Sequence, residues 1–200
     1  MRKFLKFIWV VAMTYPMLQC SKPEAAKPEV QSMAHISENI SEKENHKHDD
    51  DDWIYVNKEI TVMGDVVKPL TLTVDSLKKI NVKEIKDFDI VCQSGISKSH
   101  IESTKGVLLT EIVEKAKIAQ KDHTDRNFYI VARASDDYKA TFSWAELFNN
   151  PTGDKVYVVF EQNGNPLKKK GEMILVSLSD TKTGPRHVKW LKSIEVTRVQ

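Results

Sequence analysis

Near the C-terminus, one segment decides which fold this chain is expected to adopt: Thr183-Gly184-Pro185-Arg186-His187-Val188-Lys189-Trp190-Leu191-Lys192-Ser193-Ile194-Glu195-Val196. A Gly-Pro turn opens the segment, and the alternation of apolar and polar residues after the turn predicts a strand. The residues expected to point inward from this strand are Val188, Trp190, Ile194 and Val196. The segment therefore predicts a core strand entered through a tight turn.

Three nitrogen-bearing side chains cluster beside that turn: Arg186, His187 and Lys189. Together with the backbone N–H groups at a strand entry, such side chains can hold an anion. A solvated basic turn at the start of a core strand is the other interpretation that the residues allow. Other features of the sequence are needed to distinguish an anion-binding site from a solvated basic turn.

The first twenty residues have the features of an export signal. A basic start is followed by residues 4–13, which are apolar apart from Lys6, and this run is too short to span a membrane as a helix. Cys20 follows where a bacterial lipoprotein would be cleaved and lipidated, although Gln19 replaces the small residue usual before such a cysteine. We therefore expect residues 1–20 to be a lipoprotein-type export signal that ends at a lipidated Cys20. The alternative is a structural cysteine in an N-terminal helix.

Residues 21–52 are expected to form a disordered acidic linker. They hold four lysines and nine acidic residues and almost nothing that could build a core. The linker ends with His46 and His48 followed by four aspartates, Asp49 to Asp52. This run is either a solvated spacer or a weak chelator of a divalent cation, because imidazole and carboxylate groups are both competent ligands.

Residues 53–200 are expected to form one domain of ordinary size. The whole chain has a net charge of +2, of which the acidic linker contributes −5 and the signal +3, so the domain carries +4. A mildly basic domain on an acidic tether does not suggest nucleic-acid binding. If Cys20 carries lipid, Cys92 is left without a disulfide partner in a compartment that permits disulfides.

The patterning of this domain predicts an α+β fold that is mainly β, with two or three short helices. Short helices are expected at residues 74–80, with Asp75 as the cap, at 106–116 and at 144–149. Extended segments are expected at 54–63, 66–73, 82–92, 128–134, 139–143, 156–160 and 173–178. Residues 93–104 are expected to form a connection that approaches the helix at Gly106. Asn163-Gly164-Asn165-Pro166 is expected to form a hairpin turn.

In their order, these segments resemble the molybdopterin-binding domain of the sulfite oxidase family over nearly all of residues 54–199. The resemblance is carried by four motifs: the opening at 64–73, Cys92 with Gly95, the helix at 106–116, and residues 160–196 with Arg-His-Val-Lys-Trp-Leu. It implies a mixed, barrel-like sheet. It also implies that Cys92 ligates molybdenum and that Arg186, His187 and Lys189 hold the phosphate and pterin of the molybdopterin.

A soft thiolate suits a high-valent metal already held by pterin sulfurs, whereas the other interpretation of Cys92 is a small buried residue at a strand end. Three departures from the family are visible. The connection after Cys92 is short, Phe160 falls where the family places a tyrosine near the metal, and Ile174 falls near a family arginine. Phe160 lacks a hydroxyl, although it can equally be a core residue, with Tyr138 or Tyr157 supplying a hydroxyl from elsewhere.

The sequence therefore predicts an exported molybdopterin-dependent oxidoreductase that carries out two-electron chemistry on a small substrate with a redox partner protein, and that is not an efficient sulfite oxidase. It would lie at the bacterial cell envelope as a periplasm-facing or surface lipoprotein, attached to a membrane by lipid. The alternative is a cofactor-free binding module that keeps the fold as a scaffold.

Overall fold

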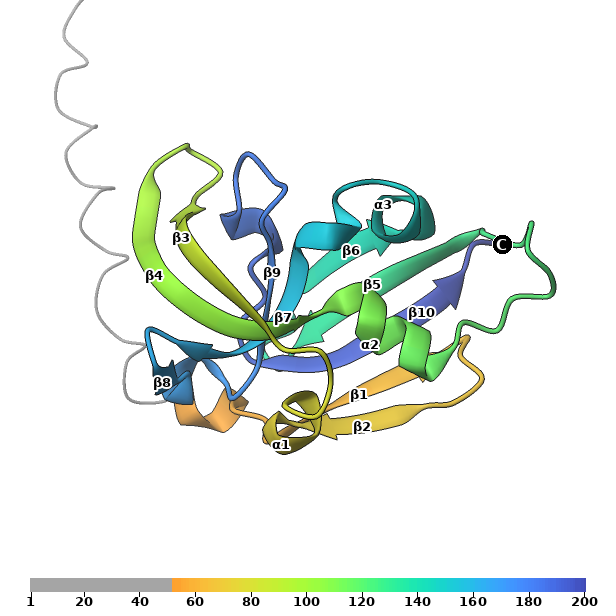
Figure 1. Ribbon diagram of the computed structural model, residues 1–200, viewed down its shortest axis with the longest axis horizontal. Helices are drawn as coiled ribbons and strands as arrows, with labels where there is room; N and C mark the ends of the chain where they lie inside the picture. Colours follow the sequence, from red (N-terminus) through yellow and green to blue (C-terminus); the bar gives the residue numbers. More distant parts are fainter. Residues whose placement is uncertain (1–51) are drawn as a thin grey trace, which may run out of the picture. The chain divides into compact units, whose positions relative to one another are not determined.

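The computed structural model describes residues 52–200, which form two five-stranded sheets (Figure 1). One sheet has the strand order β2-β1-β10-β5-β6, and the other has the order β3-β4-β7-β8, with β9 also pairing with β7. The strands are β1 (Glu59–Gly64), β2 (Leu70–Thr73), β3 (Lys83–Val91), β4 (Ser97–Leu108), β5 (Phe128–Ala134), β6 (Lys139–Ser143), β7 (Val156–Gln162), β8 (Asn165–Pro166), β9 (Ile174–Ser177) and β10 (Leu191–Arg198). The helices are α1 (Val74–Leu77), α2 (Leu109–Ala116) and α3 (Trp144–Phe148), with 3₁₀ turns η1 (Asp52–Tyr55), η2 (Gly153–Lys155), η3 (Lys168–Lys170) and η4 (Gly184–Arg186).

The prediction of a mainly β fold with a mixed sheet and two or three short helices is confirmed, although neither sheet of the described domain closes into a barrel. Among the described residues each sheet is open, because the edge strands β2 and β6 do not pair with one another and neither do β3 and β8. Cys20, His46 and His48, for which lipidation and metal binding were considered, lie outside the described residues. Within residues 52–200, no helix is long and apolar enough to cross a membrane.

The central strand of the first sheet is β10, which runs parallel to β1 and antiparallel to β5. Val188, Ile194 and Val196 are fully buried, as the alternation predicts. Trp190 is not a core residue: its φ is +48°, and a register shift between Leu191 and Ser193 turns Leu191 into the core instead. The strand therefore begins one residue after the tryptophan, and Val188 makes only an isolated bridge to Leu175.

In the second sheet, β3 and β4 form a long, curved hairpin (Figure 1). Most of the connection expected at 93–104 is therefore strand. Helix α2 begins at Leu109 rather than Gly106, because residues 106–108 pair with β7. A Cβ on Gly106 would lie 2.6 Å from the carbonyl oxygen of Val158, so the two backbones approach closely at this residue.

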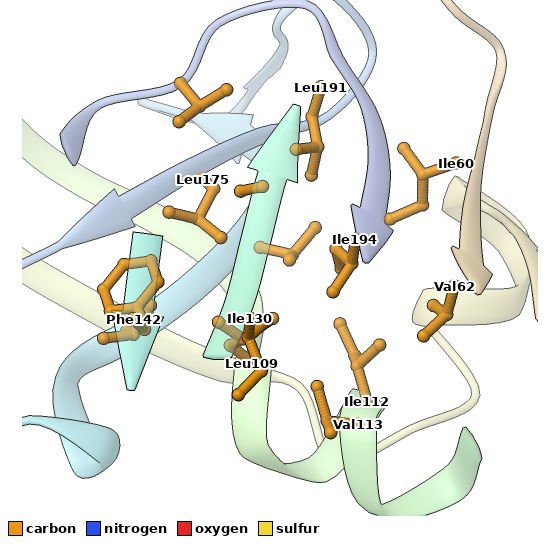
Figure 2. Close-up of a cluster of buried hydrophobic side chains, with 14 of the residues drawn as sticks. Ile60, Val62, Leu109, Ile112, Val113, Ile130, Phe142, Leu175, Leu191 and Ile194 are labelled. Atoms are coloured by element: carbon orange, nitrogen blue, oxygen red, sulfur yellow. The ribbon is translucent and has the colours of Figure 1, made fainter. Parts of the chain in front are cut away.

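The main core is formed by residues of both sheets and of α2. Helix α2 buries the residues that the apolar spacing of the sequence places on its inner face, namely Leu109, Ile112, Val113 and Ala116. Figure 2 shows the first three directed at the side chains of the sheet, among them Ile130 of β5 and Ile194 of β10. Burying each of the large aliphatic side chains contributes roughly 1.5–3 kcal/mol, so this face fixes the helix on the sheet.

Local capping explains where the shorter helices begin. Helix α1 is capped by Thr73, not by Asp75 as expected, because the Thr73 hydroxyl accepts from the N–H of Ser76 while the Ser76 hydroxyl accepts from the N–H of Thr73. Ser143 and Glu146 form the same reciprocal box at α3. The hairpin turn predicted at 163–166 is confirmed at Asn163 and Gly164, which both have positive φ, whereas Asn165 and Pro166 form β8.

Candidate functional site

The fold brings the turn at Gly184 against the end of strand β3. A Cβ on Gly184 would lie 2.8 Å from the Val91 carbonyl oxygen and 3.4 Å from the Cys92 Cα, so only glycine allows this approach. Thr183 fixes the contact, since its hydroxyl donates to the Asp89 carbonyl at 2.8 Å and accepts from the Val91 N–H at 2.9 Å. Two segments separated by about ninety residues of sequence thus meet at one place.

An open cavity of about 770 Å³ lies at this junction. Its volume falls in the range of roughly 300–1,000 Å³ that is usual for small-molecule and cofactor sites. The residues lining it come from β3, β4, the β5–β6 turn, the residue ending η3, and the segment that leads into β10: Ile90, Cys92, Gln93, Lys98, Ser99, Asp136, Tyr138, Lys170, Gly184, Pro185, His187, Lys189 and Trp190.

Cys92 is a free, partly buried cysteine at the start of the turn that joins β3 to β4. Its N–H donates to the Ile96 carbonyl at 2.9 Å, and its carbonyl accepts from the Gly95 N–H at 2.9 Å. Gly95 adopts a φ of +87°, which closes this turn. The hairpin therefore holds the thiol at the wall of the cavity.

The cavity is cationic. Lys98, Lys170 and Lys189 line it, and among the described residues of its lining Asp136 is the one acid. Burial, reinforced by the positive charges of Lys189 and Lys170, lowers the pKa of His187 to about 4. The imidazole is therefore neutral at pH 7 and can either donate or accept a hydrogen bond. Burial also lowers the pKa of Lys170, with a smaller effect of Lys189.

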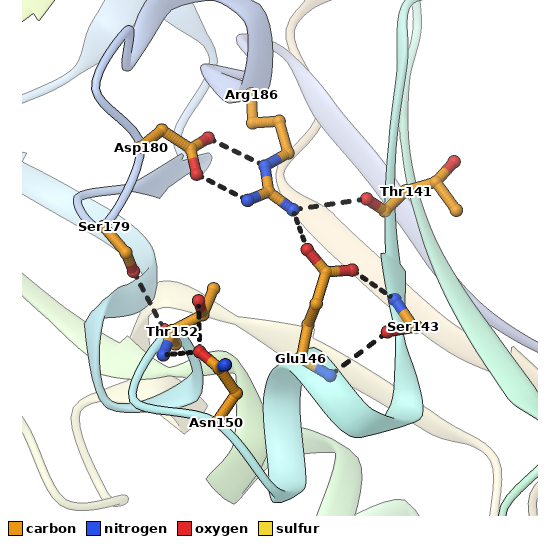
Figure 3. A network of polar contacts seen from close by, with 8 residues as sticks. All are labelled: Thr141, Ser143, Glu146, Asn150, Thr152, Ser179, Asp180 and Arg186. Atoms are coloured by element: carbon orange, nitrogen blue, oxygen red, sulfur yellow. Dashed lines mark hydrogen bonds and ion pairs between the residues drawn. The ribbon is translucent and has the colours of Figure 1, made fainter. Parts of the chain in front are cut away.

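Arg186 does not line this cavity. Its guanidinium forms a two-point ion pair with Asp180, in which Nε donates to Oδ2 at 2.7 Å, and a second pair with Glu146 at 3.1 Å (Figure 3). It also lies 4.3 Å from the centroid of the Phe142 ring. Of the three basic residues that the sequence groups together, the fold places His187 and Lys189 beside Cys92 and turns Arg186 to the other side of the segment.

Phe160 lies in the core, 4% exposed, and lines a separate pocket of about 310 Å³ near Trp53. Ile174 is likewise buried in the sheet. Of the two tyrosines considered as hydroxyl donors, Tyr138 lines the Cys92 cavity and donates to the Pro185 carbonyl at 2.7 Å. Tyr157 donates to the Asp154 carbonyl at 2.9 Å. Of these two tyrosines, Tyr138 is therefore the one that shares a cavity with Cys92, and its hydroxyl is engaged by Pro185.

Sequence reasoning missed Lys98, Lys170 and Asp136. Lys170 ends a run of three lysines before Gly171, whose φ of +93° marks a sharp reversal, and this was a usable signal. A Cβ on Gly171 would lie 2.8 Å from the Trp190 Cα, so the reversal carries Lys170 to the site. Lys98 reaches the cavity because β4 folds back on β3 just after Cys92, whereas Asp136 reaches it through the long-range pairing of β5 with β10.

Comparison with known proteins identifies the family. A family model described as the oxidoreductase molybdopterin binding domain matches residues 46–200. The chain belongs to this family. The crystal structure of the sulfane dehydrogenase SoxCD from Paracoccus pantotrophus is similar in fold, with a TM-score of 0.50 and 17% sequence identity over 73% of this chain and 39% of that chain. The chain thus spans about two fifths of the length of that protein. No curated protein matches the sequence.

The residues of the cavity fit the cofactor that this molybdopterin-binding family implies. A thiol, three lysines and a neutral imidazole meet in one open cavity. This donor set suits a soft metal ligand on one wall and a phosphate group on the other. Within residues 52–200 there is no group of three or more His, Cys, Asp or Glu side chains that could bind a metal. Cys92 is the soft donor in the lining of this cavity.

Proposed function

We propose that this domain holds a molybdenum–molybdopterin cofactor in the Cys92 cavity and takes part in two-electron redox chemistry on a small substrate. The observation that carries the proposal is the meeting of Cys92 and the segment from Gly184 to Lys189 in one cationic cavity. When bound, the cofactor supplies a metal centre that exchanges two electrons. The residues of the chain bind and orient it.

Each residue has a role that follows from its chemistry. Cys92 provides one thiolate ligand. Lys189 and Lys170 compensate the charge of the phosphate, and neutral His187 donates a hydrogen bond without adding to the local positive charge. Arg186, although predicted as a phosphate ligand, would have to give up its pairs with Asp180 and Glu146 to reach the cavity, so Lys170 takes its place in the proposal.

The proposal includes a poor activity toward sulfite. Phe160 has no hydroxyl and lies in the core, and the Tyr138 hydroxyl is engaged by the Pro185 carbonyl. The loss of one preorganised donor typically lowers a rate by about 10² to 10³. We expect steady-state turnover of sulfite by cofactor-loaded protein to stay well below an ordinary enzyme rate of about 10 per second. Turnover at that rate would contradict the assignment of the site.

Cofactor content tests the binding proposal directly. The full chain, matured in a molybdopterin-producing host, should contain molybdenum and pterin, and Cys92→Ser should lose the metal. Lys189→Gln should retain less pterin, whereas Lys192→Gln is the matched control, because Lys192 is exposed and does not line the cavity. Wild-type metal and pterin content in the Cys92→Ser protein would place the site elsewhere.

A second candidate function is a cofactor-free binding module. It is favoured by the open shape of the cavity, to which the β3–β4 hairpin contributes only the short stretches at Cys92-Gln93 and Lys98-Ser99 and the side chain of Ile90. A wild-type protein that emerges from the same host without metal or pterin would support this function over the first.

The location belongs to the proposal as well. We propose that residues 1–20 direct export, that Cys20 carries lipid, and that the acidic linker of residues 21–52 tethers the domain at residues 53–200 to a membrane of the bacterial cell envelope. The support for this is the basic and apolar start of the sequence and the cysteine that follows it. A redox partner protein would then meet the cationic mouth of the cavity from outside the membrane.

A further inference from the structure

Trp190 has an unusual backbone conformation for its residue type. Its φ of +48° lies in the left-handed region, which bulky residues rarely adopt and which persists only where neighbouring groups hold it. The residue lies between Lys189, which lines the cavity, and Leu191, which is buried in the core. The left-handed conformation of Trp190 allows the Lys189 side chain to line the cavity while the next residue, Leu191, lies in the core.

Four contacts hold Trp190 in place. Its backbone N–H donates to the Lys170 carbonyl at 2.8 Å, and its indole Nε1 donates to the Lys169 carbonyl at 2.6 Å. Its carbonyl accepts from the Ser135 N–H at 3.1 Å and from the Asn57 amide at 3.3 Å. Trp190 thus joins the segment after η1, the lysine-rich turn η3 and the β5–β6 turn.

Two of these contacts fix the backbone that carries Lys170, whose ammonium donates to Gln162 Oε1 at 3.1 Å. The indole and the backbone N–H of Trp190 both hold carbonyls of η3, next to the Lys170 side chain. The Lys189 ammonium lies 5.8 Å from the Trp190 ring centroid, within reach of a cation–π attraction. Because ordering a backbone costs conformational entropy, fixing the backbones that carry these lysines in advance favours anion binding.

We propose that Trp190 is a positioning residue, which holds Lys170 and Lys189 in place to bind a phosphoryl anion in the Cys92 cavity. The inference rests on the proposed function in its choice of anion, but it concerns only this chain's own residues. Trp190 acts through the two lysines rather than by touching the anion. Asn57 supports it from the segment that precedes β1.

The test uses inorganic pyrophosphate as the probe and the full chain produced in a host that makes no molybdopterin. Trp190→Phe keeps an aromatic ring but removes the donor to the Lys169 carbonyl, so we expect its Kd for pyrophosphate, measured by calorimetric titration, to rise about tenfold. Trp144→Phe in α3 is the matched control and should leave the Kd unchanged. Asn57→Ala, which spares the ring, should weaken binding in the same direction but by less.

A double-mutant cycle distinguishes positioning from a merely structural role. If Trp190 acts through Lys170, the effects of Trp190→Phe and Lys170→Gln on the pyrophosphate Kd should be less than additive. Fully additive effects, an unchanged Kd in Trp190→Phe, or a wild-type protein that does not bind pyrophosphate would each overturn the proposal. Wild-type protein that binds pyrophosphate but acquires no molybdenum or pterin in a competent host would support positioning while refuting the cofactor function.

Discussion

Replacing Arg186 by methionine should destabilise the domain without acting first on the cofactor. Methionine keeps much of the length and apolar character of the arginine stem but removes the two-point pair with Asp180 and the pair with Glu146. The Arg186 and Asp180 side chains are only 21% and 16% exposed, so the substitution leaves a largely buried carboxylate without its partner. The guanidinium contact with the Phe142 ring at 4.3 Å is lost as well.

The size of the effect follows from this burial. Removing one partner of a fully buried ion pair costs about 3–5 kcal/mol, whereas surface pairs contribute about 0–1 kcal/mol. For this mostly buried pair we expect a loss of about 2–3 kcal/mol in the free energy of unfolding. In a domain of this size that corresponds to a decrease in Tm of about 5–10 °C.

Thermal and urea unfolding of the full chain measure this change, and cofactor content is measured in parallel. Lys189→Met is the matched comparison. Lys189 lines the cavity and, among the described residues, has no carboxylate as close to it as Asp180 and Glu146 are to Arg186. The variant should therefore keep its free energy of unfolding within about 0.5 kcal/mol of the wild type and lose pterin. Adding Asp180→Asn to Arg186→Met should recover part of the stability, because it removes the orphaned charge. An Arg186→Met protein with wild-type Tm and no bound pterin would refute this reasoning and restore Arg186 as a cofactor ligand.

The remaining predictions concern three other residues. The pKa of His187 is about 4 in the folded domain, whereas it is ordinarily 6.5. The stability that depends on a neutral His187 is therefore complete above pH 6.5 and is lost as the pH falls toward 4. The total loss in the free energy of unfolding is about 3 kcal/mol. Urea unfolding between pH 7.5 and 4 should show this loss in the wild type and a smaller one in His187→Gln; parallel profiles would argue against it. Thr183→Val removes both hydrogen bonds to β3 and should lower the free energy of unfolding by about 1–2 kcal/mol in urea, whereas an unchanged midpoint would mean that the turn is held by packing alone. Cys20→Ser should move the protein from the membrane to the soluble fraction on cell fractionation, and continued membrane association would contradict lipid anchoring.

Much of the fold followed from the sequence, because its signals are local. The apolar spacing of residues 109–116 within two turns predicts the buried face of α2, and Asn163-Gly164 predicts a hairpin from the backbone angles that these two residues accept. The limits of this reasoning appear at Gly106. The sequence pattern predicts a helix that begins at Gly106. In the structure Gly106 instead pairs with β7, some fifty residues away, because the two backbones approach closely there.

The sequence by itself determined that Cys92 and the basic segment after Gly184 would belong to one site, through motifs kept in the family order. Only the tertiary structure decided which basic side chains face Cys92. Arg186 is paired with Asp180 and with Glu146, which is forty residues away in sequence, whereas the backbone of Lys170 is held at the site by its hydrogen bond with the Trp190 N–H. The physical reason is that periodicity is set by neighbours along the chain, but the direction of a charged side chain is set by whichever opposite charge or cavity the folded chain places beside it.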